Sequence, residues 1–137
     1  APTEDKILGF FQSMKDIAEY VVIDCTSGND DLISQLAKSH ADTVIQMVTP
    51  DLKCMSYYAS CAEQFEHLAD RRIKVMNLVD VDLFLPIGEV SEHFHGIDFT
   101  LPYSRTLKQQ TITGTLSERI PDAAYRGVAK EIAKAVI

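Results

Sequence analysis

Short runs of β-branched apolar residues alternate along this chain with longer stretches of helical periodicity. Four runs have the composition of buried strands, at 20–23, 43–48, 73–79 and 97–101. Apolar residues recur at the spacing of amphipathic helices over 4–19, 30–39, 51–70, 81–95 and 122–137. Doubly apolar strands separated by helices are typical of a parallel sheet buried between helices. The pattern therefore predicts an α/β fold, with a mainly parallel sheet flanked by helices on both faces.

The length and net charge of the chain limit the number of domains and the kinds of partner that we expect. A chain of 137 residues has the length of one domain, so we expect residues 1–137 to form a single α/β domain or a half-domain of a larger one. The formal net charge is −7, which opposes binding to a phosphate backbone. We therefore expect no direct nucleic-acid partner.

Cysteine usage and hydropathy indicate a compartment. The three cysteines, Cys25, Cys54 and Cys61, are an odd number without a CxxC pair. That argues against a disulfide scaffold or a zinc ribbon, and for a reducing environment. No apolar stretch approaches the roughly 20 residues of a transmembrane segment, and the N-terminal residues lack a signal-peptide pattern. We therefore expect a cytoplasmic protein without a transmembrane segment.

The residues that follow each strand are where a ligand is expected. Right-handed crossovers bring the carboxyl ends of parallel strands to one edge, and open α/β sheets bind ligands there. The segments to inspect are 24–30, 49–51, 77–82 and 102–105. Asn29 or Asp30 is the expected N-cap of the helix at 30–39, and a long polar loop is expected from 102 to about 121.

Phosphate-binding glycine motifs are missing from the sequence. None of the six glycines is followed by Lys, and no two lie close enough for a GxGxxG pattern. A P-loop needs GxxxxGK[ST], because its backbone N–H groups and its Lys hold the phosphates. The chain printed here therefore has no recognised phosphate-binding loop of its own.

The strand ends nevertheless form an ordered series of motifs. The first is Asp24-Cys25-Thr26-Ser27-Gly28. The second runs from Ala41-Asp42-Thr43-Val44 to Pro50, the third is Asn77, and the fourth is Leu101-Pro102-Tyr103. In this order they resemble the C-terminal half of the ParA/MinD group of P-loop ATPases, over roughly residues 16–137. The resemblance implies a partial Rossmann-like P-loop NTPase architecture.

The same resemblance implies roles for individual residues. Asp24 would be the switch carboxylate that holds a water on magnesium, and Gly28 would belong to the switch backbone. Asn77 would read the adenine edge, while Pro102 and Tyr103 would line the base pocket. ATP and magnesium are the implied ligands, bound at a dimer interface. Hydrolysis would toggle binding to a protein cargo or landmark partner in cellular positioning.

Two departures from the family pattern affect what we expect of this chain's ATPase activity and association. Cys25-Thr26-Ser27 stands where the family has Thr-Pro-Pro, and the N-terminal half that carries the P-loop is absent from this sequence. An apolar central strand without its neighbour exposes unpaired backbone groups. We therefore expect a chain that is inactive as an ATPase alone and that associates with the missing P-loop half or with a second copy as a homodimer.

Other interpretations stay open at this stage. Asp24 could cap the turn that follows it, and the side chain of Asn77 could bond the local backbone. The alternative function is a degenerate, non-catalytic α/β interaction module that has lost nucleotide binding. A receiver-like domain ranks last, because no Lys follows the fourth strand. His93-x-His95 is interpreted as a solvated helix end rather than a metal site.

Overall fold

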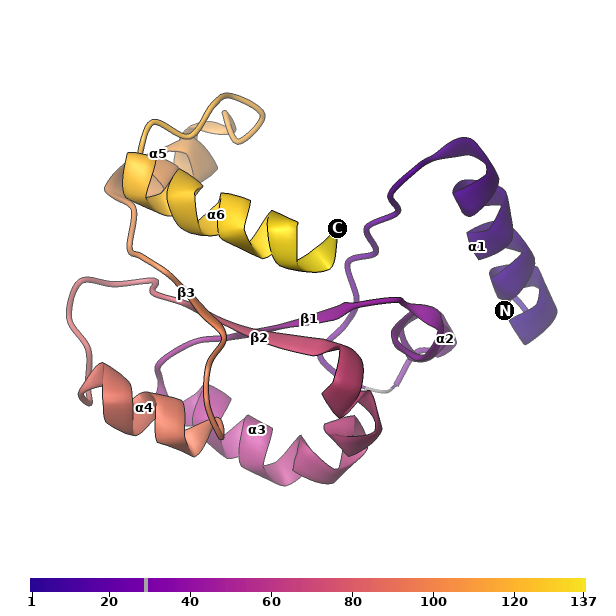
Figure 1. The fold of residues 1–137 in the computed structure, drawn as a ribbon, viewed down its shortest axis with the longest axis horizontal. Helices are drawn as coiled ribbons and strands as arrows, with labels where there is room; N and C mark the ends of the chain where they lie inside the picture. The colour runs from indigo at the N-terminus through magenta and orange to yellow at the C-terminus, as the bar shows by residue number, and fades with distance from the viewer. Residues whose placement is uncertain (29) are drawn as a thin grey trace. The chain divides into compact units, whose positions relative to one another are not determined.

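The computed structural model describes residues 1–28 and 30–137. It divides into two compact units, Ala1–Val44 and Ile45–Ile137, which are described separately below. The elements in chain order are α1 (Glu4–Ile17), α2 (Leu32–His40), β1 (Val44–Val48), α3 (Leu52–Phe65), the 3₁₀ helix η1 (Glu66–Arg71), β2 (Arg72–Asn77), α4 (Ile87–His93), β3 (Phe99–Leu101), α5 (Arg105–Thr113) and α6 (Ala123–Val136) (Figure 1).

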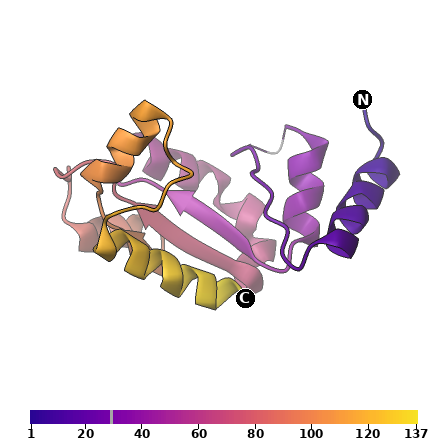
Figure 2. The same ribbon diagram turned by 90° about the horizontal axis from the view of Figure 1, so that it is seen from above.

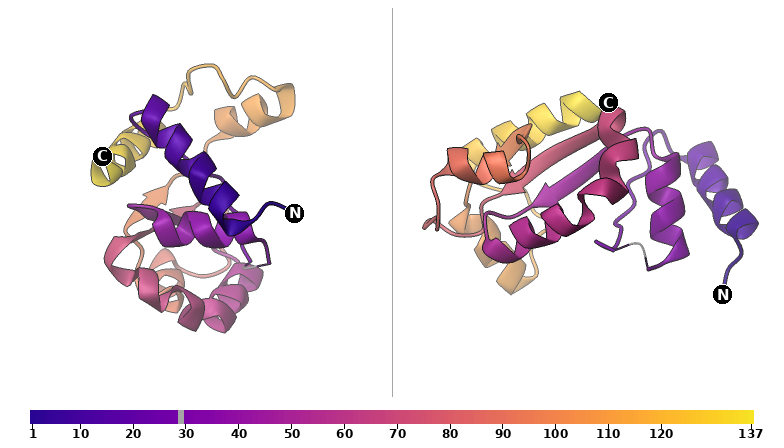
Figure 3. Two further views of the ribbon diagram at one scale, coloured as in Figure 1. Left: turned by 90° about the vertical axis from the view of Figure 1, so that its right-hand side faces the viewer. Right: turned by 90° about the horizontal axis from the view of Figure 1, so that it is seen from below.

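The second unit is built around a small parallel sheet. Its strands lie in the order β1-β2-β3 within the described residues, and the register of β2 and β3 places Val75 opposite Phe99 and Asn77 opposite Leu101. Helices α3 and α4 lie on one side of the sheet and α6 on the other, where it packs against β3 (Figures 1 and 3). In Figure 2 the strands β1 and β2 run side by side. The predicted α/β fold is confirmed at this level.

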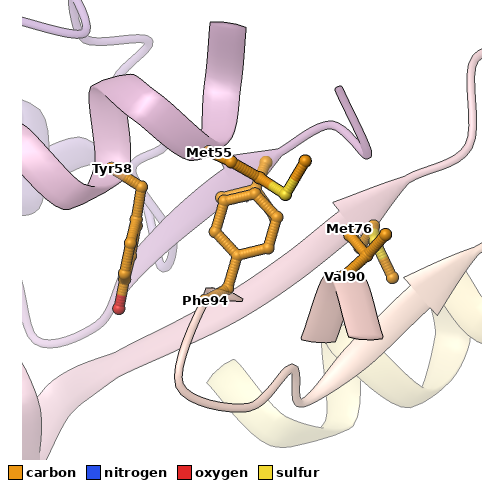
Figure 4. Close-up of a cluster of buried hydrophobic side chains, with 6 residues drawn as sticks. Met55, Tyr58, Met76, Val90 and Phe94 are labelled. Atoms are coloured by element: carbon orange, nitrogen blue, oxygen red, sulfur yellow. The ribbon is translucent and has the colours of Figure 1, made fainter. Parts of the chain in front are cut away.

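The core of the second unit lies between the sheet and the helices α3 and α4. Its buried members come from four elements or their ends: Val48, Met55, Tyr58, Met76, Val90 and Phe94 (Figure 4). The rings of Tyr58 and Phe94 meet edge to face, with centroids 5.2 Å apart at 84°, an arrangement that adds to their burial. This cluster is the main apolar contact that holds α3 and α4 on the sheet.

A lysine of the sheet forms hydrogen bonds with the C-terminal end of α4. Lys74 of β2 donates from Nζ to the carbonyl of Phe94 at 2.6 Å and to that of His95 at 3.1 Å. The same ammonium lies 5.8 Å from the Tyr58 ring centroid, within cation–π range. Because His95 has a left-handed φ of 55°, the chain turns there and returns toward β3. His93 and His95 are exposed, as expected of a solvated helix end.

The first unit is a pair of helices joined by an extended segment. Helices α1 and α2 contact each other, and Ile7, Ser34, Leu36 and Ala37 are buried. The predicted strand at 20–23 is wrong, because that segment is not a strand in the structure and Val22 is 94% exposed. An extended apolar segment becomes a strand only when a neighbour supplies hydrogen bonds, and no described strand pairs with it.

Several other boundaries differ from the prediction. The region 102–121, expected to be a loop, contains α5, whose few apolar residues give a weak helical pattern. Helix α4 starts only after Pro86, because proline is not compatible with an interior helical position. Asp31, rather than Asp30, caps α2, and Asn29 lies outside the described residues. The helical spacing over 4–19 predicts that Phe10 and Ile17 share the apolar face of the first helix, yet in the structure they are 59% and 77% exposed.

Candidate functional site

The carboxyl ends of β2 and β3 bring three of the predicted site residues together. Asn77 is the last residue of β2 and lies opposite Leu101. The N–H of Leu78 then donates to the carbonyl of Leu101 at 3.0 Å, so the pairing continues past the strand ends. Pro102 and Tyr103 follow directly, and both are half-buried, as is Asn77. The structure thus places Asn77, Pro102 and Tyr103 at one edge of the sheet, while their roles stay a prediction.

A short cap fixes the chain just beyond Tyr103. Ser104 is 6% exposed, and its hydroxyl accepts the N–H of Leu107 at 3.2 Å. This is the N-cap arrangement that satisfies an otherwise unpaired helix donor. Only Pro102 to Ser104 separate β3 from α5, so elements on both sides fix the positions of Pro102 and Tyr103.

The connection after Asn77 is apolar and exposed. Val79, Val81 and Phe84 are 54%, 69% and 71% exposed, although they lie within a few residues of one another. Asp80 and Asp82 alternate with them and are exposed as well. The apolar spacing over 81–95 predicts a mostly helical stretch that is broken or restarted at Pro86-Ile87-Gly88, and it does not predict these exposed side chains. The structure has the helix only after that break, from Ile87.

The polar residues that follow β1 form hydrogen bonds that cap the next helix, α3. The Oδ1 atom of Asp51 accepts the N–H of Cys54 at 2.8 Å, and the Thr49 hydroxyl donates to its Oδ2 atom. These bonds, the one from Thr49 first, lower the pKa of the Asp51 carboxyl, because they favour its charged form. The Cys54 sulfur in turn accepts the N–H of Thr49 at 3.3 Å. This cluster is a helix cap that orders the turn between β1 and α3.

The other two predicted site residues lie in the first unit. Asp24 is exposed and belongs to the extended segment rather than to a strand, so the prediction that it stands at a strand tip is wrong. The carbonyl of Gly28 accepts a hydrogen bond from Lys38 Nζ at 2.9 Å. Gly28 is therefore fixed by its backbone, while the switch roles of Asp24 and Gly28 stay predictions.

A network of hydroxyl and carboxylate groups that the sequence did not predict joins residues on both sides of Gly28. The Thr26 hydroxyl donates to Asp31 Oδ2 at 2.6 Å, and the Thr26 N–H donates to Ser34 Oγ at 3.1 Å. Asp31 Oδ1 also accepts the N–H of Ser34 at 2.7 Å. The hydrogen bond from Thr26, followed by those from Ser34, lowers the pKa of Asp31 from 3.8 to about 2. The spacing of Asp31 and Ser34 is that of an N-cap and its N3 residue, which is the signal that could have found it.

Searches of known protein families, of curated proteins and of solved structures found no match to this chain. Within residues 1–28 and 30–137, no helix has the length and apolar character needed to cross a membrane.

Proposed function

We propose that this chain is the nucleotide-binding half of a ParA/MinD-like switch ATPase that positions cellular cargo. The observation that supports the proposal is the edge formed by Asn77, Pro102 and Tyr103, which the β2–β3 register places side by side. The motifs at the strands that the structure does contain, from Ala41 to Pro50, at Asn77 and at Leu101 to Tyr103, also support it. A Rossmann-like P-loop NTPase architecture for the complete protein is part of the same proposal.

The chemistry of the edge suits an adenine base. A carboxamide such as that of Asn77 offers one acceptor and two donor hydrogens, which match the adjacent N6 and N7 positions of adenine. Pro102 and Tyr103 offer flat apolar surfaces on which a base can pack. All three are only half-buried, so part of each side chain is accessible to a ligand.

The remaining parts of the ATP site belong to other segments in this proposal. A P-loop half would hold the phosphates and magnesium, Asp24 would orient a water on that metal, and Gly28 would belong to the switch backbone. The partners are that P-loop half or a second copy in a homodimer, and a cargo or landmark protein in the cytoplasm. ATP hydrolysis is assigned to the assembled protein and not to this chain alone.

Adenosine provides a direct test because it carries the base without the phosphates. Titrating adenosine into the isotopically labelled chain should shift the backbone amide resonances of Asn77, Leu78 and Tyr103 through Arg105. Asn77→Asp replaces the donor amide by a carboxylate and should weaken binding about tenfold, in line with the 1–3 kcal/mol of a bidentate base contact. Tyr103→Ala should weaken it as well.

The matched control is Tyr57→Ala. Tyr57 is a half-exposed tyrosine of α3, with 41% of its surface accessible, and its loss should leave the affinity for adenosine unchanged. Guanosine should bind more weakly than adenosine, since its N2 and O6 groups do not match the same carboxamide. Equal binding of the two nucleosides, or shifts that avoid this edge, would rule out the base-reading role.

One observation favours the alternative of a nucleotide-free interaction module. Val79, Val81 and Phe84 expose apolar surface beside the same sheet edge, and clustered exposed apolar side chains mark interaction sites. In that case adenosine causes no shifts, whereas an apolar probe such as anilinonaphthalene sulfonate shifts the resonances of 79–84, and Phe84→Ser abolishes that response.

A further inference from the structure

Strand β1 is an edge strand that lacks the usual protection of edges. It has β2 on one side and, within the described residues, no strand on the other. Ile45 and Met47 are 43% and 52% exposed, whereas Val75 of the adjacent strand is fully buried. Natural edge strands usually carry a charge, a proline or a bulge that prevents pairing with another chain. The sequence Val44–Val48 has no charged residue and no proline.

The strand is complementary to itself in the antiparallel direction. If two copies pair about a two-fold axis through Gln46, Val44 of one lies opposite Val48 of the other. Ile45 then lies opposite Met47, and Gln46 lies opposite Gln46. Cross-strand apolar pairs of this kind stabilise antiparallel sheets. The two exposed side chains of each copy thus cover each other in this register.

Gln46, at the centre of the strand, has a side-chain oxygen that the pairing would satisfy. Gln46 Oε1 is buried and has no hydrogen-bond partner among the described residues. An unsatisfied buried acceptor is costly, so it marks a missing donor. Directly opposite residues of an antiparallel pair have Cβ atoms roughly 5 Å apart. After a rotation of the side chain toward the strand edge, each Gln46 can donate from Nε2 to the other's Oε1.

The charges near the strand are compatible with this pairing. The chain as a whole carries a net charge of −7, and two copies therefore repel each other at long range. In the two-fold register, however, the flanking carboxylates of Asp42 and Asp51 lie opposite Pro50 and Ala41. No carboxylate faces another across the strands, and salt screens the repulsion that remains.

We propose that β1 pairs with β1 of a second copy of this chain, antiparallel and centred on Gln46, so that the two sheets become one continuous sheet. A two-fold axis uses the same surface on both copies and closes the assembly at a dimer. The proposed function already includes a homodimer as one possible partner, and this pairing adds the surface that would join the two copies. The pairing needs no nucleotide, so it is tested without ATP and can fail independently of nucleotide binding.

Replacing Gln46 by charged residues tests the register of the pairing. Sedimentation equilibrium of the unmodified chain should show a monomer–dimer equilibrium. Gln46→Glu and Gln46→Lys should each weaken dimerisation about fivefold or more, because like charges then lie directly opposite. An equimolar mixture of the two variants should recover dimers, now joined by opposite charges. The same exchanges at Gln109, an exposed residue of α5, should change nothing.

A second variant separates pairing from folding. Ile45→Lys places a charge on the exposed side of β1 and should also yield monomers, while far-UV circular dichroism shows whether each variant keeps its secondary structure. A purely monomeric unmodified chain at its highest soluble concentration overturns the proposal. The proposal is also overturned if the folded Gln46 and Ile45 variants dimerise as strongly as the unmodified chain. A mixture of the Gln46→Glu and Gln46→Lys variants that stays monomeric would overturn it as well.

Discussion

Two short segments that contain strand-favouring residues have different structures in this molecule. Tyr20-Val21-Val22-Ile23 consists entirely of such residues, and the Ile73–Met76 part of β2 contains two of them, Ile73 and Val75. The first is extended, unpaired by any described strand and up to 94% exposed at Val22. The second is the middle strand of a sheet, and its Val75 is fully buried.

The difference lies in the surroundings and not in the residues. Strand β2 has a partner on each side and is covered by the cluster around Phe94 (Figure 4). The segment at 20–23 has neither kind of support among the described residues. A strand is thus stable only when neighbours satisfy its backbone and remove its side chains from water.

Removing the ring of Phe94 should have the largest effect. Phe94→Ala deletes a fully buried ring and leaves a cavity between α4 and Tyr58, which should lower the free energy of unfolding by about 3–5 kcal/mol. Phe10→Ala, at a ring that is 59% exposed, should change it by less than about 1 kcal/mol. Urea denaturation followed by circular dichroism measures both. Equal losses would contradict the assignment of the core.

Replacing one valine in each segment by alanine compares how much burial each segment has in solution. Val75→Ala should cost about 2 kcal/mol of unfolding free energy, because the side chain is fully removed from water. Val22→Ala should stay within about 0.5 kcal/mol, because Val22 is 94% exposed. A large cost at Val22 in the same denaturation experiment would show that the segment 20–23 is covered in solution and would remove the contrast.

Glycines in the two units should respond in opposite directions to alanine. Gly114 ends α5 with a left-handed φ of 73°, so Gly114→Ala should lower the melting temperature, at a cost of about 1 kcal/mol. Gly9 lies inside α1, and a methyl group there would meet nothing within 4 Å. Gly9→Ala should therefore raise stability by about 0.5–1 kcal/mol. The same sign at both positions would be inconsistent with these backbone conformations.

The smallest effect concerns the pH dependence of the cap in the first unit. The pKa of Asp31 is lowered from 3.8 to about 2, so its contribution to stability is present above about pH 4. That contribution is lost as the pH falls through about 2, because protonation then removes the acceptor charge. Carboxyl resonances followed by NMR should give this pKa directly. Thr26→Val should move it back toward 3.8, and an unchanged value would exclude the Thr26 hydroxyl as the main cause.

Most strands and helices of the second unit could be predicted from the sequence, because the spacing of their apolar residues matches the secondary structure that they form. The strands predicted at 43–48, 73–79 and 97–101 and the final helix all have counterparts in the structure. The segment at 20–23 was wrongly predicted because composition reports the preference for a strand and says nothing of whether a neighbour exists. Helix α5 was missed because its stability comes from the caps at Ser104 and Gly114 rather than from an apolar face.

The candidate site could be predicted only in part. The topology rule for parallel sheets placed Asn77 beside Pro102 and Tyr103, since it depends only on strand direction. The network of Thr26, Asp31 and Ser34 depends on side-chain positions in a turn, which periodicity does not encode. Asp24 was placed at a strand tip through the assumption of the strand before it, so its position failed together with that strand.

The lengths of two connections in the second unit set different limits on variation. Between β3 and α5 the chain has only Pro102 to Ser104, while between β2 and α4 it runs through residues 78–86. One extra residue in the short connection would displace Tyr103 or break the Ser104 cap. Extra residues in the long one extend an exposed loop at little entropic cost. A reporter tag or a recognition peptide is therefore best inserted between Asp80 and Asp82, and related sequences should differ in length there first.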